Sequence, residues 1–141
     1  MKKTRVKITI ALLVSLLIIS CAESNPAAEK DGLQAADKWL AVVDSRAYGD
    51  SWTEAGSLFQ SQISQDQWID TVGKVRAPLG PVLNRKNFRN EYTTTMAGAP
   101  DGEYVVCQYT TQYTNRKAAI ETITVMKNQD NGWRVVGYFI N

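Results

Sequence analysis

The spacing of apolar residues predicts helices in the first half of the chain. From Leu33 onward, apolar side chains recur every three or four positions, which is the period of one face of an α-helix. Ser64 and Gln67 have the spacing of a capping box, in which two side chains satisfy backbone N–H groups at a helix start. The stretch from Pro78 to Pro81 ends the last helical pattern. Helices are therefore predicted at residues 33–48, 50–59 and 64–79.

After Pro81 the period shortens to two, and valine, isoleucine, threonine and tyrosine become frequent. Alternation of this kind is typical of strands with one buried face. The intervening segments are rich in turn-forming residues and short enough for hairpins. Four strands are predicted, at residues 83–96, 103–113, 118–127 and 133–140. The order of elements indicates an α+β fold, with N-terminal helices packed on a curved four-stranded antiparallel meander sheet.

The same patterns predict which side chains are buried. The third helix has an apolar face made of Trp68, Val72, Val75 and Leu79. The first strand is expected to turn Phe88, Tyr92 and Met96 to one side, and Arg85, Arg89 and Glu91 to the other. The second and fourth strands carry large apolar residues on both faces, which a sheet covered on one face does not need. The second face is therefore expected to curl into a pocket or to meet another subunit in a homodimer.

The first twenty residues have the two-part pattern of a secretory signal peptide. Four basic residues precede an apolar run from Ile8 to Ile19. As a helix this run would be roughly 18 Å long, too short to cross roughly 30 Å of hydrocarbon. Ile18-Ile19-Ser20-Cys21 resembles the bacterial lipobox, whose cysteine is acylated and becomes the first residue of the mature chain. The residue after Cys21 is Ala22 rather than an aspartate, which resembles the pattern of lipoproteins sorted to the outer membrane.

These signals predict three segments: a lipoprotein signal peptide at residues 1–20, a tether at residues 21–32 and one domain at residues 33–141. The tether assignment depends on the small, polar and proline-containing run from Ala22 to Asp31. The expected location is the bacterial envelope, with the chain exported and anchored through lipid on Cys21 to the outer membrane, facing the periplasm.

Composition excludes several classes of function. The 141-residue chain has no histidine, which excludes histidine-based catalysis and histidine-ligated metals. Without the four basic residues of the signal peptide, 12 basic residues stand against 14 acidic ones, so no nucleic-acid partner is expected. No metal or cofactor is expected either, because the sequence has no ligand cluster or phosphate-binding loop. Cys107 lies in an apolar strand and is predicted to be an inert buried thiol.

Glu121 is the leading candidate for a binding site, because it interrupts an apolar and threonine-rich strand. A buried carboxylate needs a partner or a proton, and Arg134 on the next strand is the expected partner. In a pocket, Glu121 would act as a general base or hold a cationic ligand, with Tyr109 and Tyr138 as polar donors. On a wet face, it would form a weak cross-strand ion pair. Trp52 is a candidate for a pocket rim, although core packing is the default for the four tryptophans.

The run from Asn84 to Arg89 is the one local basic cluster of the domain. It would contact anionic lipid headgroups or polyanionic envelope polymers, or it would be a solvated edge strand that resists aggregation.

Several ordered blocks carry a family resemblance. They are Ala36-Asp37-Lys38-Trp39-Leu40, Ser51-Trp52, Gln67-Trp68, Arg76-Ala77-Pro78-Leu79-Gly80, Gly102-Glu103-Tyr104-Val105-Val106, Glu121-Thr122-Ile123-Thr124 and Trp133-Arg134-Val135-Val136-Gly137-Tyr138. Over residues 35–141, the sequence resembles the bacterial domain-of-unknown-function family four-zero-one-nine. The resemblance implies an exported or lipid-anchored protein without assigned catalytic residues, and a fold similar to NTF2-like and cystatin-like folds.

The leading functional interpretation is a lipid-anchored envelope protein that binds a protein partner or a small ligand without catalysis. One alternative is an NTF2-like isomerase or dehydratase with a carboxylate base, and another is a cystatin-like inhibitor or structural module. A closed pocket that holds Glu121 beside a tyrosine would favour the enzyme. A flat apolar sheet face would favour partner binding.

Overall fold

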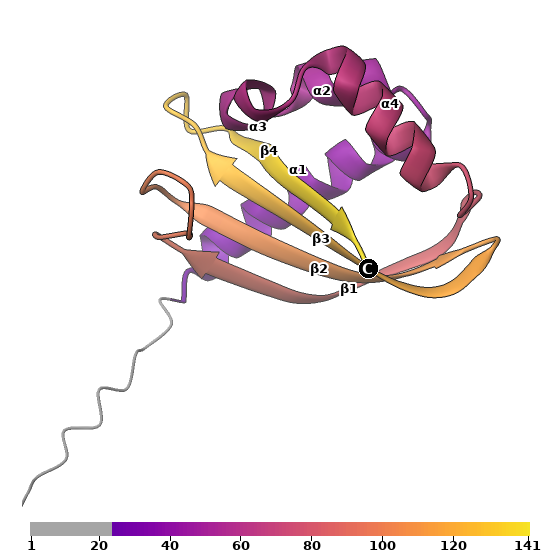
Figure 1. Ribbon diagram of the computed structural model, residues 1–141. Helices are drawn as coiled ribbons and strands as arrows, with labels where there is room; N and C mark the ends of the chain where they lie inside the picture. The colour runs from indigo at the N-terminus through magenta and orange to yellow at the C-terminus, as the bar shows by residue number, and fades with distance from the viewer. Residues whose placement is uncertain (1–23) are drawn as a thin grey trace, which may run out of the picture.

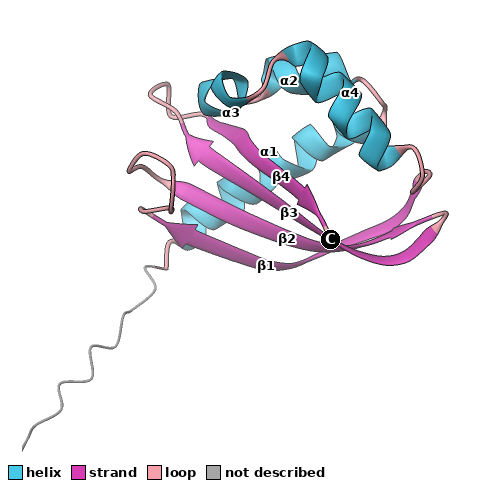
Figure 2. Cartoon of the chain, in the orientation of Figure 1, coloured by secondary structure: helices cyan, strands magenta, loops and turns pink. Residues whose placement is uncertain are grey.

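Four helices lie on one face of a four-stranded antiparallel sheet in the computed structural model, which describes residues 24–141 (Figures 1 and 2). The predicted signal peptide and Cys21 lie outside the described residues. The elements are α1 (Pro26–Asp44), α2 (Tyr48–Glu54), α3 (Ser57–Gln62), α4 (Gln65–Arg76), β1 (Val82–Thr93), β2 (Tyr104–Tyr113), β3 (Arg116–Lys127) and β4 (Trp133–Ile140). The strand order β1-β2-β3-β4 is a meander. The predicted α+β class and the four predicted strands are therefore confirmed.

Helix α1 begins seven residues before the predicted start at Leu33, so the prediction of a non-helical tether is wrong for residues 26–32. Asn25 caps the helix by accepting a hydrogen bond from the Ala28 N–H, and Pro26 suits the first turn, where its missing N–H costs nothing. Gly32 lets the helix approach the sheet, because a Cβ there would lie 2.7 Å from the Cβ of Val105. Only the part before Leu33 is absent from the predicted helix, because these first turns bury small residues rather than large apolar ones.

Helix α1 runs along β2, in the same direction as that strand. Gly32 lies against Val105 near the start of β2, and Asp37 accepts a hydrogen bond from Tyr109 farther along. The end of the helix, at Asp44, reaches Arg85 of β1. The N-terminus of α1 and the β2–β3 turn therefore lie at opposite ends of the domain (Figure 1).

The helix predicted at residues 50–59 is two helices, because the segment between them contacts β4. Gly56 separates α2 from α3 and donates a backbone hydrogen bond to the Val135 carbonyl. A Cβ at Gly56 would lie 3.1 Å from a methyl group of Val136, so a side chain would crowd this crossing. Gln60 then donates to backbone carbonyls at the end of α2, which holds the break together.

Helix α4 has the predicted capping box at Ser64 and Gln67, but it ends at Arg76. Trp68 and Val72 are buried as predicted. Val75 is 46% exposed, and Leu79 follows the end of the helix, so both predictions of burial on this face are wrong. Arg76, four residues after Val72, takes the buried position because its charge has partners inside the domain.

Two β-bulges decide which side chains face the helices. In β1, Asn87 pairs with Tyr109 and Arg89 pairs with Gln108, so Phe88 is an extra residue. The bulge shifts the alternation. As a result Arg85 faces the helices and Phe88 is 53% exposed on the other face, the reverse of the prediction for both residues.

The second bulge is at Val136 of β4, since Val135 pairs with Val125 while Gly137 pairs with Thr124. It turns both Val135 and Tyr138 toward the helices, although they are three residues apart. We call the face toward the helices the inner face and the opposite one the outer face.

The core contains an aromatic cluster between the inner face and the helices. Trp39 and Trp68 have ring centroids 5.9 Å apart, and both pack against Phe59 and Tyr138. Both indole N–H groups donate to Ser51, Trp39 to its carbonyl at 2.7 Å and Trp68 to its hydroxyl at 3.0 Å. Ser51, fully buried, thus satisfies the polar atoms that the tryptophans bring into the core.

We expect Trp68→Ala to lower the free energy of unfolding by about 3 to 5 kcal/mol, because it leaves a cavity among aromatic rings. Ile69→Ala is the matched control on the adjacent, 39% exposed position, and should cost less than about 1 kcal/mol. Urea denaturation of both variants measures the difference. Equal, small losses would show that α4 does not bury Trp68.

Candidate functional site: a buried charge network

Glu121 is fully buried in the middle of β3 and has hydrogen-bond donors on both carboxylate oxygens. Oε1 accepts from the Arg85 Nε at 2.9 Å and from the Thr111 hydroxyl at 2.5 Å. Oε2 accepts from the Tyr138 hydroxyl at 2.5 Å, and an Arg76 nitrogen lies 3.7 Å away. The carboxylate is therefore saturated by groups from β1, β2, β4 and α4.

Asp44 completes the network from the end of α1. One carboxylate oxygen is 2.6 Å from the Arg85 Nη1, and the other is 2.6 Å from the Arg76 Nη2. Arg85 also donates from Nη2 at 3.0 Å, so its contact with Asp44 is bidentate. Two arginines thus neutralise two carboxylates, and the side chain of Asp44 is the most exposed of the four, at 28%.

The protonation states follow from burial and charge. Burial by itself would raise the pKa of Asp44, but hydrogen bonds from Arg85 and Arg76, together with their charges, hold the pKa below its usual value. Burial raises the pKa of Tyr138, and the negative charge of Glu121 raises it further. At neutral pH, Asp44 is ionised and Tyr138 keeps the proton that it donates to Glu121.

Tyr113 lies at the edge of this network. The Arg76 guanidinium carbon is 5.0 Å from the centre of its ring, a cation–π contact. The Tyr113 hydroxyl is buried and has no hydrogen-bond partner within residues 24–141. Burial raises its pKa to about 12, and the charge of Glu121 adds to the shift, so this hydroxyl also stays protonated.

The predicted pair between Glu121 and Arg134 is wrong. Glu121 pairs in register with Ile140 at the end of β4, whereas Arg134 pairs with Met126 beside the β3–β4 turn. Arg134 instead forms an ion pair with Asp130 at 3.1 Å. The tight turn fixes the register, and the register keeps the two residues far apart along the hairpin. The exposed cross-strand ion pair considered for Glu121 is also wrong, because its side chain is fully buried.

The other candidate residues are divided between this network and separate places. Tyr138 donates a hydrogen bond to Glu121. Tyr109 is opposite Glu121 in the β2–β3 register, but its hydroxyl donates to Asp37 at 2.9 Å. Trp52 lies apart from the network, and its indole N–H donates to the Ile63 carbonyl at 2.9 Å. A role for any of them in binding stays a prediction.

Sequence reasoning missed Arg85 and Arg76 as partners of Glu121, and Asp44 as the second carboxylate that the two arginines contact. Arg85 was assigned to the solvent face because a bulge at Phe88 leaves no mark in a simple alternation. Asp44 and Arg85 are 41 residues apart, so only the packing of α1 on the sheet brings them together. One signal in the sequence could have indicated a buried polar site. Thr111 is a polar residue on the apolar face of β2, next to the strand that carries Glu121.

The network is buried behind an open cleft of about 400 Å³. Asp44 and Arg76 belong both to the network and to the cleft wall, whereas Glu121 does not line the cleft. The wall also contains Arg46, Tyr48, Gly73, Ala77, Gly80 and Pro81. The cleft therefore meets the ionised carboxylate of Asp44 and not that of Glu121.

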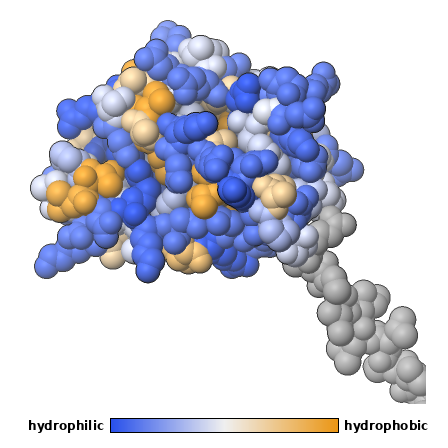
Figure 3. Space-filling view, turned by 180° about the vertical axis from the view of Figure 1, so that it is seen from behind, coloured by the Kyte–Doolittle hydropathy of each residue, from blue (hydrophilic) through white to orange (hydrophobic). Residues whose placement is uncertain are grey.

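A second cleft, of about 440 Å³, lies between α1 and the β3–β4 turn. Trp133, Arg134, Lys38 and Glu54 are among the residues that line it. The back of the domain is largely hydrophilic, and its hydrophobic residues form small separate patches (Figure 3). That view therefore shows no broad apolar surface.

Three other features bear on chemistry. Cys107 is fully buried, and burial together with the charges of Asp37 and Glu29 raises its pKa to about 12, so the thiol is unreactive at neutral pH. Residues 24–141 contain no group of three or more side chains placed to bind a metal ion. None of the helices in that range combines the length and the apolar character that a membrane span requires.

We expect Arg85→Met to lower the free energy of unfolding by about 3 to 5 kcal/mol, because it leaves buried carboxylates without their shared cation. Arg89→Met is the control on the same strand. Arg89 also pairs with a carboxylate, Glu91 at 2.7 Å, but the two side chains are 61% and 48% exposed. Its loss should cost less than about 1 kcal/mol. Adding Glu121→Gln to Arg85→Met should recover part of the stability; similar losses for Arg85→Met and Arg89→Met would contradict the network.

The lowered pKa of Asp44 predicts a pH dependence. The folded carboxyl binds a proton less readily than the unfolded one, so its stabilising contribution is complete above the unfolded pKa of about 4 and is lost as the pH falls through the lower folded pKa. Asp44→Asn should therefore be less stable than the natural chain at pH 6, and the difference should shrink at lower pH. Denaturation at several pH values between about 2 and 6 tests this. A constant difference would show that the ionised form of Asp44 is not what stabilises the fold.

Comparison with known protein families gives a match over most of the described chain. The profile of DUF4019, a family described as a protein of unknown function, matches residues 35–138. No curated protein and no solved structure matches the chain. The matched range extends from the middle of α1 to β4, so it contains every residue of the charge network. The chain belongs to the DUF4019 family.

Proposed function

We propose that this chain is a lipid-anchored protein of the bacterial envelope that binds a ligand and does not catalyse a reaction. The observation that carries the non-catalytic part is the saturation of Glu121. Its carboxylate is fully buried, and both oxygens already accept hydrogen bonds from the protein. A general base must reach its proton directly or through one water. Glu121 lacks that access, so it suits a structural role better than a catalytic one.

Asp44 is the network carboxylate that meets a cleft, and it too is a poor base. Arg85 and Arg76 hold its pKa below the usual value, whereas efficient bases have a pKa near the working pH. This disfavours the isomerase or dehydratase alternative, although Glu121 does contact a tyrosine as that alternative required.

The anchor is supported by the signal-peptide pattern and by the position of α1. Four residues separate Cys21 from Pro26, where α1 begins. Fully extended, the five residue steps from Cys21 to Pro26 would reach at most roughly 18 Å. A lipid on Cys21 would therefore hold the N-terminal end of α1 close to the membrane surface, with little freedom for the domain to move away.

The binding role is supported by the cleft at the other end of α1. Its volume of about 400 Å³ falls within the range of small-molecule sites, and two of its wall residues, Asp44 and Arg76, are held in place by the network. Helix α1 has 19 residues and is roughly 28 Å long. An anchored domain would thus present this cleft away from the membrane.

We expect Cys21→Ser to abolish incorporation of a palmitate analogue and to release the protein from the membrane fraction. A substitution of Ser24 to alanine, three residues later in the chain, is the control and should leave labelling unchanged. Metabolic labelling followed by membrane fractionation measures both properties. Equal labelling of the natural chain and the Cys21→Ser variant would overturn the lipid anchor.

A further inference from the structure

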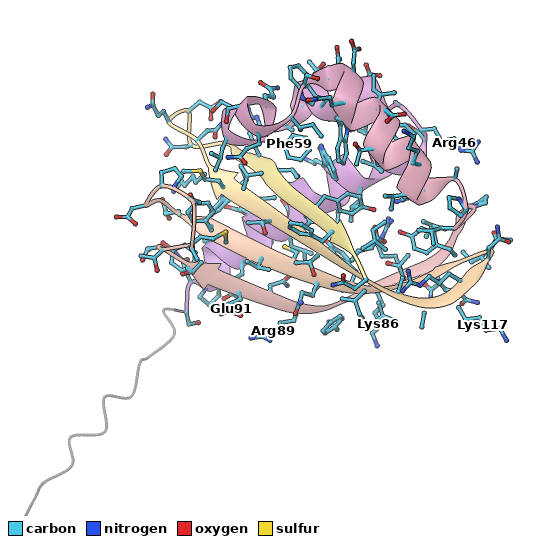
Figure 4. The ribbon with its side chains drawn as sticks, in the orientation of Figure 1. Arg46, Phe59, Lys86, Arg89, Glu91 and Lys117 are labelled. Carbon is cyan, nitrogen blue, oxygen red and sulfur yellow. The ribbon has the colours of Figure 1, made fainter. Side chains whose placement is uncertain are left out.

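The two ends of the domain differ in charge. At the end formed by the β2–β3 turn, Lys86, Arg116 and Lys117 are exposed, and none of them forms an ion pair within the described part of the chain. Figure 4 shows Lys86 and Lys117 on the side of the sheet away from the helices. Arg89 is on the same side but is neutralised by Glu91 at 2.7 Å.

The register brings these cations to one end of the sheet. Val82 at the start of β1 pairs with Tyr113 at the end of β2, and Tyr113 pairs with Arg116 at the start of β3. Lys86 is opposite Thr110, three residues before Tyr113. We call Lys86, Arg116 and Lys117 the basic end; Arg46, which is exposed, lies on the helix side of the same end (Figure 4).

Three acidic residues on this side of the domain already have cationic partners. Asp44 and Glu121 belong to the arginine network, and Asp70 pairs with Lys74 at 2.6 Å. The uncompensated charge on this part of the sheet is therefore positive, even though acidic and basic residues are equal in number over residues 33–141.

The end at which α1 begins is different, because among the described residues Lys30 is its unpaired cation and two others already have partners. Lys127 pairs with Glu103 at 3.1 Å, and Arg134 pairs with Asp130 at 3.1 Å. The remaining acids at this end include Glu29, Asp31 and Asp101. Strand β2, with ten residues, separates the two ends by roughly 30 Å.

We propose that the basic end binds an acidic polysaccharide. The choice of partner rests on the proposed function, because a lipid on Cys21 would place the acidic end at the membrane. Electrostatic attraction to anionic headgroups fades within a Debye length of about 8 Å, so the basic end would lie beyond the field of its own membrane. A polyanion that extends away from the membrane has repeated charges that can meet Lys86, Arg116 and Lys117 together, and binding would release its counterions.

The test uses the full-length chain in non-ionic detergent and dextran sulfate as the acidic polysaccharide, with neutral dextran as the blank. The double variant Lys86→Glu and Lys117→Glu reverses two of the three charges of the basic end. The matched variant, Lys30→Glu and Lys38→Glu, makes the same change in net charge on exposed lysines of α1. Thermal unfolding of both variants confirms that they are folded.

We expect the basic-end variant to lose at least about tenfold in affinity for dextran sulfate, and the matched variant to lose less than about threefold. The affinity of the natural chain should fall steeply with salt, and neutral dextran should not bind. Equal losses in the two variants would overturn the proposal, because net charge alone would explain binding. Absence of binding by the natural chain, or binding to phosphatidylglycerol vesicles without binding to dextran sulfate, would also overturn it.

The outcome is separable from that of the proposed function. Labelling of Cys21 does not depend on Lys86 or Lys117. Labelled protein that fails to bind dextran sulfate would overturn the polysaccharide proposal and leave the anchor intact. Unlabelled protein that binds it through the basic end would overturn the anchor and leave the charge-based recognition intact.

Discussion

The fold depends on Arg85, which joins the end of α1 to the interior of the sheet. One guanidinium contacts both Glu121 and Asp44, and each carboxylate also lies near Arg76. Burial of Glu121 is tolerable only because cations and hydroxyl donors replace the water that it lost. The partners come from α1, α4 and three further strands. Every charge is therefore paired only when the helices pack on the sheet in this one position. Hydrophobic contacts alone are less selective, because apolar surfaces can slide past one another at small cost.

The two bulges make this arrangement possible. Strict alternation would place Arg85 and Tyr92, seven residues apart, on opposite faces of β1, and the extra residue at Phe88 puts both on the inner face. The bulge at Val136 does the same for Val135 and Tyr138 in β4. One bulge thus places Arg85 on the inner face, and the other places Tyr138, which donates to Glu121, on the same face. Bulges also increase the local twist, which suits a sheet that must pack against a long helix.

This explains what the sequence could and could not predict. The periods of three to four and of two report burial on one face, so they located the strands and the capped start of α4 at Ser64. They also singled out Glu121, because a charge within an apolar strand conflicts with its surroundings. They failed for Arg85, because a bulge changes the face of every residue on one side of it without any change in composition. They failed at the start of α1 because Ala28 and Gly32 are too small to give a strong apolar signal.

The bulge in β1 also links the interior to the surface. Arg85 and Lys86 are adjacent, and they face opposite sides of the sheet, one toward Glu121 and the other toward solvent. The network beneath is neutral overall, since two arginines meet two carboxylates, and so it contributes little to the field outside. The charge that a distant partner meets at this end therefore comes from Lys86, Arg116 and Lys117. Because Asp44 and Glu121 are paired with the two arginines of the network, neither acid is available to compensate Lys86, Arg116 or Lys117, and this end of the domain is positive.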